Sequence, residues 1–227
     1  MSTKAGSTPT SSIAPLSAWR VPLFLSGIAA IVGGAMHPKS ADSHAVAERT
    51  ASMIVGHEGI WIVGHSLMTI GAALLLTGFL GARKANAWPG ASRALSFAIP
   101  AAALSVVDLV LHTLDVLDGD ELATGNIPLL TRVHLVVALV AGVVFGLAFA
   151  GLAWSLGRTW GGPRQFVAAI GIVAGLASAI AVPVVLIFGA DILFPIGAVG
   201  GALWAIATGI TGAPALERTV PVGVTTT

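Results

Sequence analysis

The residues of this chain that could carry chemistry are histidines and carboxylates set within long apolar stretches. Asp108, His112 and Asp115 follow one another at spacings of four and three residues, which places them on one face of a helix. His65 and His134 stand in two other apolar stretches. Imidazole suits zinc, copper and iron, and a carboxylate can complete such a ligand set. These side chains therefore predict a site for a divalent transition metal ion.

The expected first ligands are three histidines from three separate helices, namely His65, His112 and His134. Asp108 is expected either as a fourth ligand or as the carboxylate that orients one of the imidazoles. A site of this kind leaves a coordination position for water or substrate. The same histidines could instead bind a single haem iron as axial ligands, and the residue types do not distinguish an ion from a haem.

Two carboxylates, Glu58 and Asp115, are the candidates for a catalytic general base beside a bound metal. No established motif names the chemistry, because the string His57-Glu58 is followed by His65 eight residues after the first histidine, whereas zinc-protease helices place the second histidine four residues on. Cysteine and tyrosine are absent. Thiolate ligands and phenolic acids are therefore excluded.

The amino-acid composition indicates the class of protein that holds these side chains. Of the 227 residues, 56% are hydrophobic and 9% are charged, and the mean hydropathy is +0.93, whereas a soluble domain carries about 25% charged residues. This excludes a cytosolic enzyme, a nucleic-acid-binding protein and a disordered chain. The net charge of +1 gives no strong field for an anionic polymer. The chain is predicted to be an integral membrane protein surrounded by lipids.

Six apolar stretches have the roughly 20 residues that a membrane-spanning helix needs. The predicted fold is therefore all-α: a polytopic membrane protein whose domain, residues 17–212, is a bundle of six transmembrane helices. A disordered cytoplasmic tail, residues 1–16, is expected before it, and a second cytoplasmic tail, residues 213–227, after it. The six predicted spans are Ser17–Met36, Gly59–Leu80, Ala94–Leu117, Leu129–Trp154, Phe166–Phe188 and Ile192–Gly212.

Lysine and arginine gather on one side of this predicted topology. Cytoplasmic loops carry the excess of these residues, so both termini are expected in the cytoplasm and the protein in the plasma membrane. The histidines and acids above then lie in the outer half of the bilayer, while His37 and His57 lie at the outer surface as possible further members of the site. The cytoplasmic set is Lys4, Arg20, Arg83, Lys84, Arg93, Arg158, Arg164 and Arg218, against Lys39, Arg49 and Arg132 outside.

The function expected from this cluster is that of a metal- or haem-dependent membrane oxidoreductase or hydrolase acting on a small or lipophilic substrate. A proton-coupled carrier is one alternative, although the inner half of the predicted bundle has no histidine to continue a relay. A non-catalytic partner subunit is another. Glycines at four-residue spacing, such as Gly142 and Gly146 or Gly197 and Gly201, favour close helix packing within the bundle, or a homo-oligomer formed through these faces.

Overall fold

The computed structural model describes residues 18–40, 43 and 45–212, and within these residues the secondary structure is entirely helical. The predicted tails, residues 1–16 and 213–227, lie outside the described residues, as does His44. Apolar sequence in hydrocarbon must satisfy every backbone hydrogen bond internally, which favours helices of this kind.

Six long apolar helices form the body of the protein. Five of them are long and apolar enough to cross a membrane, and α1, with 16 residues, is shorter. At 1.5 Å per residue α1 measures about 24 Å, less than a hydrocarbon core of about 30 Å. The predicted class, a polytopic helical membrane protein, is confirmed. The six are α1 (Arg20–Ala35), α3 (Glu58–Lys84), α4 (Ser92–Leu114), α6 (Leu129–Gly157), α7 (Pro163–Phe188) and α8 (Leu193–Thr211).

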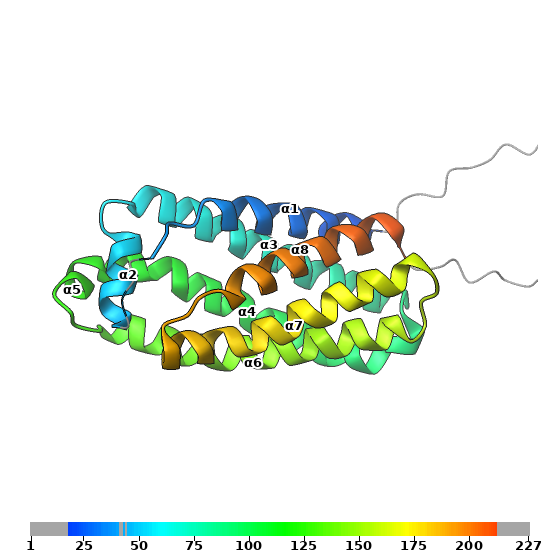
Figure 1. The fold of residues 1–227 in the computed structure, drawn as a ribbon. Helices are drawn as coiled ribbons and strands as arrows, with labels where there is room; N and C mark the ends of the chain where they lie inside the picture. The colour runs from blue at the N-terminus through cyan, green and yellow to red at the C-terminus, as the bar shows by residue number, and fades with distance from the viewer. Residues whose placement is uncertain (1–17, 41–42, 44, 213–227) are drawn as a thin grey trace, which may run out of the picture.

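The six helices are arranged in a closed ring, in which each packs against two neighbours in the order α1, α3, α4, α6, α7, α8 and back to α1. Figure 1 shows the long helices lying side by side along one direction. The ring closes between the first and last helices, where Arg20 Nε donates to the carbonyl oxygen of Gly209 at 2.8 Å. Sequential helices are therefore spatial neighbours, as short connections require.

The two ends of the bundle differ in what fills them. Toward the end where α1 begins, a dry core joins aromatic side chains from several helices. At the opposite end two short helices, α2 (Val46–Ile54) and α5 (Gly119–Ala123), pack against each other across the bundle (Figure 1). We call this the capped end. The aromatic core includes Trp19, Phe79, Trp88, Phe149, Trp160 and Trp204.

Glycines bring the later helices into direct backbone contact. A Cβ atom added to Gly146 on α6 would lie 2.5 Å from the carbonyl oxygen of Gly175 on α7, and one added to Gly175 would lie 2.7 Å from that of Gly146. On α8 a Cβ at Gly197 would meet Ser178, whereas at Gly201 it would meet no atom within 4 Å. The prediction of close helix contacts is thus confirmed for Gly146 and Gly197 and is wrong for Gly201.

Candidate metal centre

Four histidine rings from four parts of the chain form a continuous row at the capped end. His37 follows the end of α1, His65 lies on α3, His112 in the last turn of α4 and His134 near the start of α6. The ring centroids of His37 and His65 are 4.9 Å apart, those of His65 and His112 4.4 Å, and those of His112 and His134 4.5 Å. His112 is therefore the centre of the row.

The helix ends explain why these rings meet. α4 ends at Leu114 and continues as a short 3₁₀ helix, η2 (Asp115–Asp118), before the chain turns back into α6. His112 and His134 therefore lie side by side in antiparallel helices although 22 residues separate them. His65 lies two turns inside α3, at a depth that matches theirs.

Three candidate ligand atoms, one each from Asp115, His112 and His134, form a small triangle. Its Oδ2 lies 3.3 Å from His112 Nδ1 and 2.5 Å from His134 Nδ1, and the two Nδ1 atoms are 3.5 Å apart. A tetrahedral ion with bonds of about 2.05 Å separates its ligands by roughly 3.3 Å. Two edges of this triangle already have that length, and the third, from Asp115 to His134, would have to open by roughly 0.8 Å on that geometry.

Surrounding polar groups hold the ligands in place. The Thr131 hydroxyl lies 3.3 Å from the second oxygen of Asp115 and 2.8 Å from Asp118. Asp108 Oδ1 lies 3.5 Å from His134 Nε2, so His134 has a carboxylate beside each ring nitrogen. Metal-bound imidazoles commonly direct their second nitrogen at a carboxylate. This geometry favours Asp108 in the orienting role rather than as a fourth ligand.

Two carboxylate oxygens of this centre lack a well-aligned hydrogen bond despite their short contacts. They are Oδ2 of Asp115 and Oδ1 of Asp108, and both atoms are buried. A buried carboxylate oxygen without a donor is costly. A cation bound at this place would satisfy Asp115, and the ring proton that His134 then keeps on Nε2 would face Asp108. The donor set therefore fits an ion.

The predicted ligands do not all surround one point. The described residues contain two possible metal-ligating groups, His37–His65–His112 and His112–Asp115–His134, each with ligand atoms within 4.8 Å of one another. His65 falls in the first group and His134 in the second, because the ring of His112 stands between them. The single shell of His65, His112 and His134 expected from the sequence is thus divided into two.

Glu58 lies outside both groups. It is exposed at the first position of α3, where its carboxylate accepts a hydrogen bond from the Gly56 N–H at 2.8 Å. The side chain therefore serves the helix start and belongs to neither group of possible ligands, and its predicted role as general base stays a prediction. Asp115, the other predicted base, is 1% exposed and in direct contact with both imidazoles, which is a ligand's position. His57 is also exposed.

Two residues near the centre were not assigned to it from the sequence. His37 was only a possible further member, and Thr131 was not predicted at all. His37 joins the row beside His65, and the only signal for it was a histidine at the end of the first span. Thr131 is 1% exposed and touches two carboxylates. A threonine one turn before His134, on the same helix face, is the pattern that could have predicted it.

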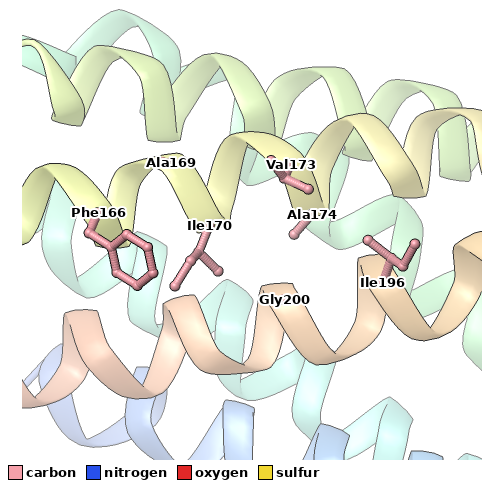
Figure 2. A pocket seen from close by; sticks show the side chains of 7 residues that line it. All are labelled: Phe166, Ala169, Ile170, Val173, Ala174, Ile196 and Gly200. Carbon is pink, nitrogen blue, oxygen red and sulfur yellow. The ribbon is translucent and has the colours of Figure 1, made fainter.

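The centre is largely buried, and two grooves on the surface of the bundle do not include its residues. One quarter of the His112 side chain is exposed. An apolar groove of about 280 Å³ runs between α7 and α8, where Phe166, Ile170 and Ile196 line it (Figure 2). A second lies between α4 and α6. Neither is lined by an ionisable side chain, which is typical of a lipid-facing surface.

Comparison of the chain with protein-family models, with curated proteins and with solved structures finds no match. The fold and the clustered side chains define a polytopic helical membrane protein with a histidine and aspartate centre at one end. Its function has to be argued from that centre.

Proposed function

We propose that this membrane protein binds a divalent transition metal ion through His112, Asp115 and His134. The observation that carries the proposal is the triangle of ligand atoms, with separations of 3.3 Å and 3.5 Å on two edges and a third edge closed by a direct carboxylate–imidazole contact. The distribution of lysine and arginine supports an orientation that places this centre in the outer half of the plasma membrane.

The ligand types narrow the choice of ion. Two imidazoles and one carboxylate are a familiar set for zinc and iron, and imidazole also binds copper. A haem between two of these histidines is less well supported, because ring centroids 4.4 Å to 4.5 Å apart leave no space for a porphyrin between them. Binding one would require the helices to separate. The proposal is therefore an ion.

Three protein ligands leave a tetrahedral ion with one position for water or a substrate. His112, whose side chain is one quarter exposed, gives the direction of access. The surroundings are apolar helices, so the substrate class proposed is small or lipophilic, and the reaction class is hydrolysis or oxidation. Asp108 lies next to His134 but outside the ligand triangle. Its side chain is 22% exposed, so this carboxylate stays partly accessible beside the proposed ion.

The test is metal binding by protein purified in a mild detergent. The metal-free protein is titrated with Zn²⁺ in competition with a chromophoric chelator, and with Co²⁺, whose visible absorption reports tetrahedral coordination. We expect saturable binding that is lost or weakened at least 100-fold in His134→Ala and Asp115→Asn. Two exposed residues of the same end supply matched controls, His57→Ala and Asp120→Asn, which should bind like the original chain. Equal affinity in all five proteins would remove the proposal.

A proton-coupled carrier is less well supported by the fold. Such a carrier needs titratable groups along the whole path, whereas the core toward the other end is made of buried aromatic and aliphatic side chains. Proteoliposomes with an imposed pH gradient separate the two functions, since a carrier moves substrate or protons and a metal-dependent enzyme does not.

A further inference from the structure

We infer that the protein has a second metal position, made only of imidazoles, in which His37 and His65 bind an ion together with His112. The inference extends the proposed function, because it makes His112 common to both positions. Its own two ligands are distinct from those of the first centre. His65 is fully buried and His37 is partly buried, so the position adjoins the first centre on its α1 and α3 side.

The hydrogen bonds of His65 fix which ring nitrogen is free. Its Nδ1 lies 2.8 Å from the carbonyl oxygen of Trp61. A carbonyl only accepts, so Nδ1 carries the proton and Nε2 of the neutral ring keeps a lone pair. This Nε2 is buried and has no hydrogen-bond partner. A buried acceptor without a donor is rare in a folded protein and points to a missing ligand.

His37 is oriented in the same way. Its Nδ1 lies 2.8 Å from the carbonyl oxygen of Pro38, which again leaves the lone pair on Nε2. His112 directs Nδ1 at Asp115 and His134, so its Nε2 is the nitrogen available to the other side. One ring nitrogen of each of His37, His65 and His112 lies within 4.8 Å of the others. Nitrogen ligand atoms of three imidazoles are thus gathered at one place, and a cation is what such a group binds.

The surrounding structure keeps this position rigid. The indole of Trp61 is fully buried, and its ring centroid is 4.0 Å from that of His65 and 4.9 Å from that of His112. Its Nε1–H donates to the His112 carbonyl oxygen at 3.2 Å. α2 and α5 cover Trp61 from the capped end, through Ile54 and Leu122. Rings held by packing are preorganised as ligands.

The chemistry of the three ligands selects the ion. Neutral nitrogen ligands without a carboxylate suit zinc and copper rather than magnesium, calcium or manganese. When both positions are filled, His112 binds one ion through Nδ1 and the other through Nε2. Binding through both nitrogens requires that the ring loses its remaining proton to solvent, so an imidazolate bridges the two ions. The protein would then hold a pair of metal ions at fixed separation.

Stoichiometry tests the inference. Titration of the metal-free protein with Zn²⁺ should give two equivalents per chain. His37→Ala should lose one equivalent and keep the other, and His134→Ala should lose the other one. His112→Ala should lose both, and His57→Ala should keep both. His37 lies outside the helices and is only partly buried, so we expect its replacement to disturb folding less than that of the fully buried His65. Gel filtration and circular dichroism verify the fold of each variant.

The outcomes separate this inference from the proposed function. One equivalent in the original chain, lost in His134→Ala and unchanged in His37→Ala, overturns the second position and leaves the first. One equivalent that is lost in His37→Ala and kept in His134→Ala supports the imidazole position and overturns the first. Two equivalents unaffected by His37→Ala overturn the inference.

A spectroscopic measurement gives a second readout. With two equivalents of Cu²⁺, ions bridged by the imidazolate of His112 couple antiferromagnetically, so the electron paramagnetic resonance signal should fall increasingly below that of two isolated ions as the sample is cooled to a few kelvin. His37→Ala with one equivalent should show the full signal of one ion. An undiminished two-ion signal in the original chain would overturn the bridge.

Discussion

Replacement of Asp108 by asparagine tests the arrangement of carboxylates around His134 without altering side-chain size. Asp108 Oδ1 lies 3.5 Å from His134 Nε2, and the Asp108 side chain is 22% exposed. In the proposed centre His134 binds the ion through Nδ1, so Asp108 acts only on the orientation and basicity of the ring. The substitution removes the negative charge but retains an oxygen acceptor.

The expected magnitude follows from this position. Removal of a carboxylate behind a metal-bound imidazole typically weakens binding about 10- to 100-fold. Because the contact is long and partly exposed, Asp108→Asn should fall near the lower end, with affinity for Zn²⁺ reduced about 10-fold, or roughly 1.4 kcal/mol. Asp115→Asn removes a ligand and should weaken binding far more.

The assay is competition between the purified protein and a zinc chelator, with Asp120→Asn as the matched control. Asp120 is an exposed acid at the same end of the bundle, so its replacement should leave the affinity within a factor of two. An unchanged affinity in Asp108→Asn would contradict the orienting role. A loss as large as that in Asp115→Asn would instead make Asp108 a direct ligand.

Three further predictions follow from the same structure. Gly146→Ala should lower thermal stability by about 1–3 kcal/mol, because the added Cβ overpacks against the backbone of α7. Gly201→Ala is the control and should leave stability unchanged, because a Cβ there meets no atom within 4 Å. Fluorescence-detected gel filtration after heating compares the two variants. Metal affinity should fall as the pH is lowered, because an imidazole must be deprotonated to bind and protons compete with the ion for its lone pair. Chelator competition over a series of falling pH values measures this, and an affinity that stays constant until the protein unfolds would contradict histidine ligands. The chain has no cysteine, so Asp120→Cys should react with an impermeant maleimide on intact cells and Lys84→Cys only after permeabilisation; the reverse pattern would invert the predicted orientation.

The sequence by itself determined the helices and the side chains available for chemistry. Apolar stretches of about 20 residues have no alternative to helix in hydrocarbon, and the predicted span Leu129–Trp154 therefore matches the observed α6, Leu129–Gly157. The spacing of Asp108, His112 and Asp115 also predicted that these side chains lie on one side of their helix, and all three lie near His134 or its neighbours in the centre. A spacing of three or four residues fixes which side chains share a face, because the helical repeat is constant.

Only the tertiary structure decided how these faces meet. Spacing along one helix says nothing of how that helix is rotated against its neighbours, so the sequence could not place His112 between His65 and His134. The sequence also predicted no helix between the first two predicted spans, whereas residues there form α2 at the capped end (Figure 1). Glu58, the first residue of α3, bonds the nearby Gly56 N–H and belongs to neither group of possible ligands. The contacts between helices, set by packing of small and large side chains, divided the one expected set of ligands into two groups of possible ligands that share His112.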